Sequence, residues 1–580
     1  MSVLTETPDA DGAFPRLTDA QLALLAEHGE RRPVEAGDVL FREGEPTGTF
    51  FVVLSGLVAI VEGYGADERV VRAHGPGRFL GELGLLEGQV AFLTAVVREP
   101  GEVLAVPVAE VTGVLACEPG LADLVLRAYL NRRSLLLGQG TGLRIIGSRY
   151  CPDTRRLLAF AVRNRLPHRW TDLEHDGRAE ALLRSLGVTA AQTPVVLLGR
   201  DRVLRNPTNA RLAEMVGMRA PAPREELCDL LVVGAGPAGL AAAVYGSSEG
   251  LATTVLDAVA TGGQAGASSL IENYLGFPAG ISGAQLAERA VVQASKFGAL
   301  ITVPATAVAL DHRADGHYAV RLDDGGEIAA HTVVVATGAL YHRLDVPGCR
   351  EREGVGVHYA ATAREAQQCR ADPVAVVGGG NSAGQASIFL AAQSPRVYLV
   401  VRGDDLSADM SRYLVDRIEA NPRIEVLPHS EVCEVTGDKA VESAVAEDRR
   451  TGERRTLPIG ALFVFIGARP GTAWLAGTVA LDERGAVLTG RDAAPAAEAE
   501  RRRHLGRAPL MLETSLPGVF AVGDVRSGSI KRVASAVGEG SMSVHQVHEY
   551  LREVGRSALD EPRHRNPFAT GPTARPAGKA

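Results

Sequence analysis

The sequence has few cysteines, no excess of basic residues and no long apolar run. Its 580 residues include six cysteines, and no two are spaced C-x-x-C, so a disulfide framework and the usual zinc sites are excluded. The net charge of −8 argues against binding to nucleic acid or to an anionic membrane. No apolar run reaches about 18 residues and no signal peptide is visible, so we expect a cytoplasmic protein without a membrane span or a metal.

The length predicts several domains, because a single hydrophobic core stops growing well below 580 residues. Short β-branched runs with frequent glycine breaks, from about 17 to 108, predict a small antiparallel β-barrel. Alternating strand and helix patterns from 143 to 215 predict a small α/β domain. A stretch rich in proline and alanine at 219–223 then introduces a long α/β region.

A dinucleotide-binding motif opens that region. The apolar strand at 229–233 runs directly into Gly234, Gly236 and Gly239 of a G-x-G-x-x-G turn, and a helix follows. The three glycines allow a tight turn, a close approach of a pyrophosphate to the backbone, and packing of helix on strand. The next strand ends in Asp257, where a carboxylate can accept a hydrogen bond from a ribose hydroxyl.

A second copy of the motif begins with the apolar strand at 373–377. It continues through Gly378, Gly380 and a helix to a strand that ends at Arg402, with no acid at that place. Two such motifs in one chain predict two dinucleotides, which is typical of a flavin that exchanges electrons with a nicotinamide. The sequences VVVATG at 333–338 and GVFAVGD at 518–524 flank the second copy, and the latter ends in Asp524.

Together these motifs resemble the low-molecular-weight thioredoxin reductases over roughly 228–552, with further matches at Gly263-Gln264, at 271–277, at 467–472 and at 516–518. The resemblance implies FAD, NADPH with NADH as an alternative, a homodimer, and a rotation between two dinucleotide-binding domains. The implied FAD ligands are Gly234, Gly236, Gly239, Asp257, Gly263, Gln264, Asn273, Ala336, Thr337, Gly338, Gly523, Asp524, Arg532, Val533 and Ala534. The implied NAD(P)H ligands are Gly378, Gly380, Asn381, Ser382, Ala383 and Arg402.

The sequence departs from that family at its redox pair. The stretch that would carry C-x-x-C has alanine at both positions, Ala360 and Ala363. Because a flavin-to-disulfide relay needs one thiol to attack and a second to resolve, reduction of thioredoxin through this pair is excluded. Cys369 follows six residues later, and we expect it to be a buried apolar residue. Arg402 stands beside Asp404 and Asp405, which would repel a 2′-phosphate.

Cys151 is the candidate catalytic residue. The sequence Cys151-Pro152-Asp153-Thr154 lies between a strand and a helix, and Gln192-Thr193-Pro194 precedes a second strand. This pairing resembles monothiol glutaredoxins and other thioredoxin-fold proteins, and it implies a cis Pro194 that faces the cysteine. A thiolate at a helix N-terminus is favoured by the helix dipole. The alternative is a structural thioredoxin-like domain with an idle cysteine.

The predicted barrel contains FLGELGLL at 79–86, which resembles the phosphate-binding cassette of cyclic-nucleotide-binding domains. The resemblance places the ribose-binding acid at Glu82 and the phosphate-binding arginine of that family at Ala91, which carries no charge. Loss of a charge-assisted contact weakens binding about tenfold to a hundredfold. Both a nucleotide effector and a docking or dimerising module without a ligand stay open.

We therefore expect a multidomain protein with a cyclic-nucleotide-binding-like β-barrel, a thioredoxin-like α/β domain and two Rossmann-like domains. The expected boundaries are 1–140 and 141–218 for the two front domains, 219–227 for a linker, 228–345 with 480–552 for the FAD domain, 346–479 for the NAD(P)H domain, and 556–580 for a disordered tail. The expected function is transfer of electrons from NAD(P)H through FAD to a disulfide, reached through Cys151, or to a small-molecule acceptor. The alternatives are a flavoenzyme that reduces ferredoxin, a quinone or oxygen, and a non-enzymatic sensor of redox state or nucleotide.

Overall fold

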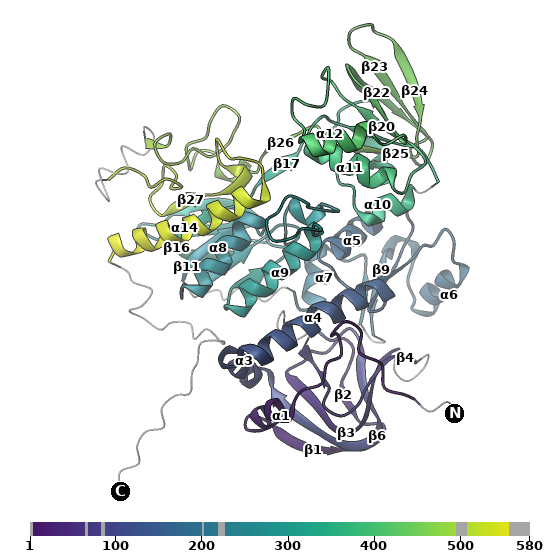
Figure 1. The fold of residues 1–580 in the computed structure, drawn as a ribbon, viewed down its shortest axis with the longest axis vertical. Coiled ribbons are helices and arrows are strands. Elements are labelled where there is room, and N and C mark those ends of the chain that lie inside the picture. The colour runs from purple at the N-terminus through teal and green to yellow at the C-terminus, as the bar shows by residue number, and fades with distance from the viewer. Residues whose placement is uncertain are drawn as a thin grey trace.

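The computed structural model describes residues 4–63, 68–82, 88–199, 202–218, 227–369, 371–494 and 507–555. The linker residues 219–226, the tail 556–580 and residues 83–86 of the predicted cassette lie outside these ranges. Figure 1 shows the N-terminal sheet at one end of the molecule, the later dinucleotide-binding domain at the other end, and the long helix α4 (Pro119–Gln139) beside the N-terminal sheet. Within the described residues, no helix is both long and apolar enough to cross a membrane.

The N-terminal domain is an antiparallel sheet built around two strands of 14 residues each, β3 and β6. The strand order is β1-β6-β3-β4, with β2 on β6 and β5 on β3. A capping box between Thr18 and Gln21 begins the first helix, and Pro119 begins α4. The remaining elements are α1 (Asp19–Ala26), β1 (Glu30–Val34), β2 (Val39–Phe41), β3 (Thr49–Glu62), β4 (Arg69–His74), β5 (Phe79–Leu80), β6 (Thr94–Pro107) and α3 (Val108–Cys117).

The middle domain is a four-stranded mixed sheet with the order β10-β9-β7-β8. β7 runs parallel to β8 and antiparallel to β9, which in turn is antiparallel to β10. The Thr193–Pro194 peptide bond that precedes β9 is cis, which confirms the geometry expected at that proline. The elements are β7 (Leu143–Ile146), α5 (Pro152–Arg163), β8 (His168–Thr171), α6 (Gly177–Ser185), η1 (Ala190–Gln192), β9 (Val195–Leu198), β10 (Arg202–Arg205) and α7 (Asn209–Met215).

The first dinucleotide-binding domain has a seven-stranded sheet, in which β11, β12, β13, β16 and β27 pair in parallel and β14 and β15 form an antiparallel extension. Its buried strands are continuous apolar runs, because one face packs on the helices α8 and α14 and the other on β14, β15 and the segment that contains Leu475 and Val479. The elements are β11 (Cys228–Val233), α8 (Pro237–Ser248), β12 (Thr253–Leu256), η2 (Ala265–Ala267), α9 (Gly283–Lys296), β13 (Leu300–Thr302), β14 (Ala307–His312), β15 (Tyr318–Leu322), β16 (Glu327–Val335), η4 (Ala473–Leu475), β27 (Val519–Ala521), η5 (Gly523–Val525) and α14 (Val533–Glu553).

The second dinucleotide-binding domain is inserted into the first. Its five parallel strands have the order β18-β25-β19-β20-β21, and a separate antiparallel sheet has the order β22-β23-β24. The elements are η3 (Arg350–Arg352), β18 (Val357–His358), α10 (Ala363–Gln368), β19 (Val374–Val377), α11 (Asn381–Ala391), β20 (Val397–Val400), α12 (Arg412–Glu419), β21 (Ile424–Leu427), β22 (Ser430–Thr436), β23 (Ser443–Asp448), β24 (Arg454–Pro458) and β25 (Ala461–Val464).

Two chain segments connect the dinucleotide-binding domains, and they pair as the short antiparallel strands β17 (Ala339–Tyr341) and β26 (Ala468–Pro470). Directly after β26, Leu475 and Val479 already pack into a core cluster of the first domain. The chain therefore rejoins the first domain a few residues before position 480, the boundary expected from the sequence.

The front domains dock on the first dinucleotide-binding domain through helix α9. Val292 of α9 packs into the apolar cluster of the N-terminal domain. The carboxylate of Glu288, one turn earlier, lies 3.0 Å from Nε of Arg133 in α4 and 3.0 Å from Nη2 of Arg165, which follows α5. Because Glu288 is almost completely buried, this three-residue cluster is an interface contact and not a surface pair.

Candidate functional site

The glycine turn after β11 is sterically specific for glycine. Gly234 has a φ of +111°, and a Cβ there would lie 2.2 Å from the carbonyl oxygen of Ala336. A Cβ on Gly239 would lie 1.8 Å from the carbonyl oxygen of Gly234. No larger residue fits at either position without moving backbone atoms, so the turn and the start of α8 are held tightly together.

In contrast, the space above Gly236 is open. The nearest atom to a Cβ built on Gly236 is the Cα of Gly263, 3.8 Å away. Gly236 is the N-cap of α8 and provides no side-chain cap, so the first backbone N–H groups of the helix are available to an anion. An open cradle above a helix N-terminus fits the pyrophosphate of FAD.

Asp257 follows β12, as predicted, and its carboxylate accepts three backbone hydrogen bonds. Oδ2 accepts from the N–H of Ala235, and Oδ1 accepts from those of Val259 and Ala260, all at 2.9 Å. Each carboxylate oxygen has two lone pairs, so a contact to a ribose hydroxyl adds to these bonds and does not replace them. The ribose contact stays a prediction, whereas the role of Asp257 in fixing the glycine turn is visible.

Asp524 is the acid with the most capacity left. It follows β27, is half-buried, and makes no hydrogen bond or ion pair with any residue that the structure describes. Burial raises the pKa of its carboxyl group, and the nearby Lys531 partly opposes that shift. A buried acceptor without a partner is costly, and the ribityl hydroxyls of a flavin would satisfy it.

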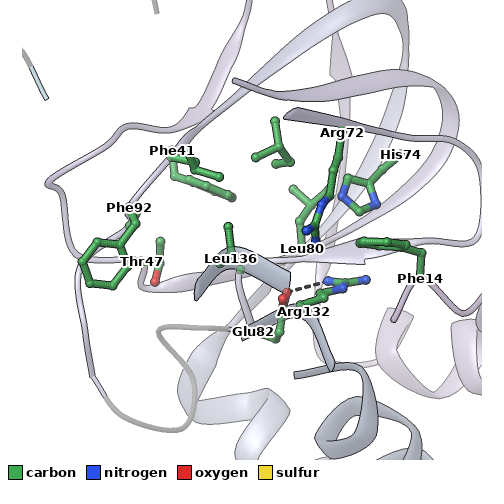
Figure 2. A pocket seen from close by; sticks show the side chains of 14 residues that line it. Phe14, Phe41, Thr47, Arg72, His74, Leu80, Glu82, Phe92, Arg132 and Leu136 are labelled. Carbon is green, nitrogen blue, oxygen red and sulfur yellow. Dashed lines mark ion pairs between the residues drawn. The ribbon is translucent and has the colours of Figure 1, made fainter. Parts of the chain in front are cut away.

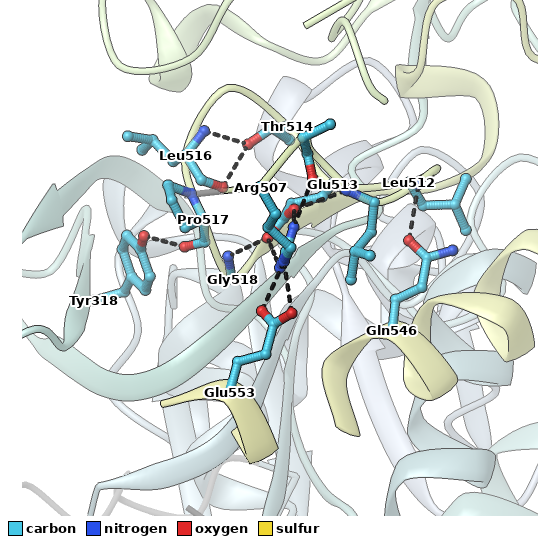
Figure 3. Close-up of polar contacts among 12 residues, drawn as sticks. Tyr318, Arg507, Leu512, Glu513, Thr514, Leu516, Pro517, Gly518, Gln546 and Glu553 are labelled. Atoms are coloured by element: carbon cyan, nitrogen blue, oxygen red, sulfur yellow. Dashed lines mark hydrogen bonds and ion pairs between the residues drawn. The ribbon is translucent and has the colours of Figure 1, made fainter. Parts of the chain in front are cut away.

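Two glutamates that the sequence did not single out hold the segment around Asp524. Oε2 of Glu539 accepts a hydrogen bond from the backbone N–H of Gly523 at 2.7 Å. Glu513, which is 2 % exposed, accepts from the N–H of Gly518 at 2.9 Å and pairs with Arg507 at 2.6 Å. Arg507 also pairs with Glu553 of α14, and Figure 3 shows this network around the turn before β27. Nothing in local sequence spacing connects these residues, so only the fold brings them together.

The other predicted FAD residues surround the same region. The side chain of Gln264 donates to the carbonyl oxygen of Ala339, and Oγ1 of Thr337 donates to that of Gly471 at 2.8 Å. Gly338 has a φ of +61° with open space where a Cβ would be. Arg532 is the N-cap of α14, and Val533 and Ala534 form its first turn. Asn273 is exposed in the loop between Ile271 and Ile281, away from these contacts.

The second glycine turn repeats the first. Gly378 has a φ of +138°, and a Cβ there would lie 2.3 Å from the carbonyl oxygen of Phe465. A Cβ on Gly380, the N-cap of α11, would meet no atom within 4 Å. Asn381, Ser382 and Ala383 form the first turn of that helix, and Asn381 Oδ1 accepts from the N–H of Ser411 at 2.7 Å. This cradle fits the pyrophosphate of NAD(P)H.

At the end of β20, Arg402 is not the only cation. Glu431 lies 3.5 Å from Nε of Arg402 and 3.6 Å from Nε of Arg449, while Asp404 pairs with His429 at 3.2 Å. Two arginines therefore share one glutamate, and the neighbouring Asp404 and Asp405 add further negative charge, so a 2′-phosphate would meet two cations but no excess of positive charge. Sequence reasoning missed Arg449 because it lies 47 positions after Arg402 and reaches the same place only through the β22–β23 hairpin.

Cys151 is the N-cap residue of α5 and is half-buried. The close packing of its motif is visible at Gly147, where a Cβ would lie 2.3 Å from Oγ1 of Thr154 and 2.8 Å from Cβ of Pro194. Thr154 of the cysteine motif and the cis proline therefore both lie close to Gly147. That Pro194 faces Cys151 stays a prediction.

The remaining cysteines do not form a second reactive site. Burial raises the pKa of Cys228 and of Cys369 to about 12, and it also raises the pKa of Cys349 and Cys433. The expectation that Cys369 is a buried apolar residue is confirmed, since it is 4 % exposed. Cys117 is exposed at the end of α3.

In the N-terminal domain, Glu82 and Ala91 lie on the wall of one cavity. The Glu82 carboxylate already has a partner within the protein, because Nη1 of Arg132 from α4 lies 2.8 Å from it. Arg132 also donates to the backbone oxygens of Ala13 and Phe79. A contact between Glu82 and a ribose hydroxyl stays a prediction. To make it, Glu82 would have to bind the hydroxyl while it is paired with Arg132.

Comparison with known proteins agrees with the two glycine cradles. Residues 228–540 match the family described as pyridine nucleotide-disulphide oxidoreductase, which is more than half of the chain. The chain belongs to this family. Residues 31–116 match the cyclic nucleotide-binding domain. The protein is thus an FAD-dependent NAD(P)H oxidoreductase of the thioredoxin reductase type with an N-terminal cyclic nucleotide-binding domain.

The thioredoxin reductase of Eremothecium gossypii is 33% identical over 331 residues, which is 56% of this chain and 98% of that protein. The thioredoxin reductase of Treponema pallidum is 33% identical over 323 residues, 56% of this chain and 97% of that protein. The crystal structure of Lactococcus lactis thioredoxin reductase, in its FR conformation, has 26% identity and a TM-score of 0.50 over 56% of this chain and 99% of that one.

Proposed function

We propose that this oxidoreductase passes electrons from NAD(P)H through FAD to a low-molecular-weight disulfide that first reacts with Cys151. FAD, held at Gly234–Gly239 and Asp524, would accept a hydride from NAD(P)H, held at Gly378–Ala383 and Arg402, and pass on two electrons. The chain itself contributes the two cradles, the acceptor groups that orient the ribityl and ribose hydroxyls, and one thiol outside the inserted domain.

The observation that supports this proposal is the position of helix α5. At its C-terminal end, Asn164 Nδ2 donates to the carbonyl oxygen of Val259 in the first dinucleotide-binding domain, at 3.0 Å. At its N-terminal end, Nζ of Lys439 in the second domain lies 5.4 Å from the ring centroid of Tyr150. The 12 residues of α5 span about 18 Å. Cys151 therefore lies beside the second domain, about one helix length from the contact with Val259 of the first domain.

The proposed chemistry balances. The Cys151 thiolate attacks one sulfur of a disulfide RSSR, the S–S bond breaks, and one RSH leaves after protonation. The product is a mixed disulfide between Cys151 and R. Two electrons and one proton from NAD(P)H, relayed by FAD, then release the second RSH and restore the thiolate. The sum is NAD(P)H + H⁺ + RSSR → NAD(P)⁺ + 2 RSH.

A rotation of the second dinucleotide-binding domain against the first would bring the nicotinamide to the flavin. The two strands β17 and β26 are the short link between the dinucleotide-binding domains. An ion pair joins the two domains: Nη1 of Arg417, on α12 of the second domain, lies 2.7 Å from the carboxylate of Glu272 in the first. Because both side chains are partly exposed, this contact is weak enough to break and re-form during a rotation.

Thioredoxin itself is not the proposed substrate. The relatives named above are thioredoxin reductases, but the chain has no C-x-x-C pair, and alanines stand at 360 and 363. Without two thiols at these positions, the attack and resolution steps cannot both occur at the place where the family carries its redox pair. We propose instead that the middle domain is glutaredoxin-like and supplies the single thiol.

The test is NAD(P)H oxidation with glutathione disulfide, cystine and thioredoxin as acceptors, in the unchanged protein and in Cys151→Ser and Cys117→Ser. We expect turnover with at least one small disulfide, a loss of at least a hundredfold in Cys151→Ser, and no change in Cys117→Ser, which removes another accessible thiol. Full turnover in Cys151→Ser would show that the acceptor meets the flavin directly.

That outcome would favour the second candidate function. Ala360 is half-buried and stands where the family carries a redox cysteine. The inserted domain therefore has no disulfide at this position to take electrons from the flavin. A small molecule such as a quinone or oxygen, or ferredoxin, could then accept electrons. Fast flavin reduction with no turnover for any acceptor would favour a redox sensor.

We also propose the organisation that this function requires. The domains are assigned to 1–140, 141–218, 228–345 with the segment from about 474 to 552, and 346 to about 473, and the chain is assigned as a homodimer, to be checked by sedimentation. All six cysteines are free, which is typical of a reducing compartment and supports a cytoplasmic location. An effector of the N-terminal domain would act through α4, whose Arg133 contacts Glu288 of the FAD domain.

A further inference from the structure

A cavity in the N-terminal domain contains a buried arginine with no anionic partner. The cavity has about 580 Å³ of empty space, counted with its opening to solvent. Figure 2 shows Arg72, from β4, beside the cavity together with His74 and Phe14. Arg72 is 7 % exposed and makes no hydrogen bond or ion pair with any described residue, and its Nη2 is fully buried.

The charges around this cavity do not cancel. Glu82 is already paired with Arg132, at 2.8 Å, and both side chains are about 95 % buried. His74 is neutral, because burial and the three nearby arginines hold its pKa well below the usual value of 6.5. Burial and Arg132 lower the pKa of Arg72 to about 10, so its guanidinium is still charged near neutral pH. The lining therefore carries one uncompensated positive charge.

A ring contact holds the guanidinium in place. The Cζ atom of Arg72 lies 4.6 Å from the ring centroid of Phe14, and the same ring lies edge-on to His74 at 5.7 Å. A cation–π contact offsets only part of the cost of burying a charge. The planar guanidinium keeps its N–H donors for a group that can accept two of them, as a carboxylate does.

The rest of the cavity wall is apolar. Phe41, Ile60, Leu80, Phe92 and Leu93 line it, together with Leu136 of α4. Thr47 and the neutral His74 are polar residues on the wall, and the Thr47 hydroxyl has no hydrogen-bond partner among the described residues. A nucleotide would bring many polar atoms into a site with few groups to satisfy them, which is unfavourable.

We propose that this cavity binds an organic monoanion, a carboxylic acid with an aliphatic or aromatic body, whose carboxylate pairs with Arg72. The acid group neutralises the buried guanidinium and the body fills the apolar wall. The assignment concerns the N-terminal domain alone and does not depend on which acceptor takes electrons from FAD. In cyclic-nucleotide-binding domains the phosphate is bound by an arginine at the position of Ala91, which lies on the same wall and carries no charge. In the proposed site the anion is bound by Arg72 instead.

The experiment is titration calorimetry of the full chain with a series of linear carboxylates, with phenylacetate, with the matching neutral amides, and with the cyclic nucleotides cAMP and cGMP. We expect the linear acids to bind about fourfold more tightly for each added methylene until the cavity is full. The neutral amides should bind at least tenfold more weakly than the acids. A preference for phenylacetate over the linear acids would identify an aromatic body within the same class.

Variants of β4 separate a ligand-binding arginine from a structural one. Arg72→Met should abolish carboxylate binding, Arg72→Lys should keep part of it, and Arg69→Met, an exposed arginine on the same strand, should not change it. Without ligand, Arg72→Met should melt at the same temperature as the unchanged protein or higher, because it removes an uncompensated buried charge. Tighter binding of a cyclic nucleotide than of every carboxylate, equal binding of acids and amides, or no binding of any carboxylate would overturn the proposal.

Discussion

At the scale of single residues, the FAD site depends most on Asp524. Its carboxyl group is half-buried, burial raises its pKa, and it has no hydrogen-bond partner among the described residues. Replacement by alanine removes a charge-assisted contact to the flavin, so we expect FAD to bind about tenfold to a hundredfold more weakly. Flavin content after dialysis measures this. Asp311→Ala, on an exposed strand of the same domain, serves as the control, and full flavin content in Asp524→Ala would contradict the assignment.

We expect the two arginines on Glu431 to influence the choice between NADPH and NADH. Removing both, as Arg402→Ala with Arg449→Ala, should lower kcat/KM for NADPH about tenfold, because a 2′-phosphate loses its cations. The value for NADH, which has no such phosphate, should change less than twofold. Arg454→Ala, which removes an exposed arginine paired with Glu447, is the matched control. An equal loss of kcat/KM for NADPH and NADH would show that the two arginines do not recognise the 2′-phosphate.

His74 makes the stability of the N-terminal domain depend on pH. Its pKa is lowered in the folded chain by burial and by Arg132, Arg78 and Arg72, so only the unfolded chain takes up a proton below pH 6.5. The stabilisation is fully present above pH 6.5 and falls by about 1.4 kcal/mol for each pH unit below it. Urea unfolding between pH 5.5 and 7.5 measures this dependence. The pH dependence should be lost in His74→Gln and kept in His175→Gln. An unfolding free energy of the unchanged protein that does not vary with pH in this range would contradict the prediction.

Sequence reasoning found the residues whose role is local. The glycines at 234, 236 and 239 were predicted because each is needed for the turn itself, and the structure shows the steric reason. Arg72 and Arg449 were not found, because their partners come from distant segments of the chain. A buried arginine without an acid cannot be recognised until its neighbours are known.

At the scale of elements, Glu288 of α9 is the main electrostatic contact between the front domains and the FAD domain. Its replacement by alanine leaves Arg133 and Arg165 without their shared anion, and we expect a loss of about 3 kcal/mol in unfolding free energy. Urea unfolding followed by flavin fluorescence measures it. Asp123→Asn breaks an exposed pair on α4 and should change stability by less than about 0.5 kcal/mol. Equal effects of the two changes would mean that Glu288 does not hold the domains together.

Strands and helices with strong local patterns were predicted close to their observed bounds. The apolar run that became β11 and the helix that became α8 are examples, since strand, glycine turn and helix follow one another without a gap. The docking of α4 on α9 was not predicted. Both helices have apolar faces, but the sequence of neither says which other surface covers that face.

At the scale of the whole molecule, the proposed path for electrons rests on two nucleotide cradles and on α5, whose two flanking residues contact both dinucleotide-binding domains. The order of domains followed from motifs in the sequence, because each motif occupies one continuous segment. The position of Cys151 beside the second domain did not, since it depends on contacts of Tyr150 and Asn164 with residues far away in the chain.

The most direct measurement is anaerobic stopped-flow absorbance of the bound flavin. The protein is first reduced with one equivalent of NADPH and then mixed with glutathione disulfide, in the unchanged chain, Cys151→Ser and Cys117→Ser. We predict that NADPH bleaches the flavin in all three, and that the disulfide restores its colour in the unchanged chain and in Cys117→Ser only. A flavin that NADPH does not bleach, or one that recovers equally fast in Cys151→Ser, would contradict electron transfer from NAD(P)H through FAD to Cys151.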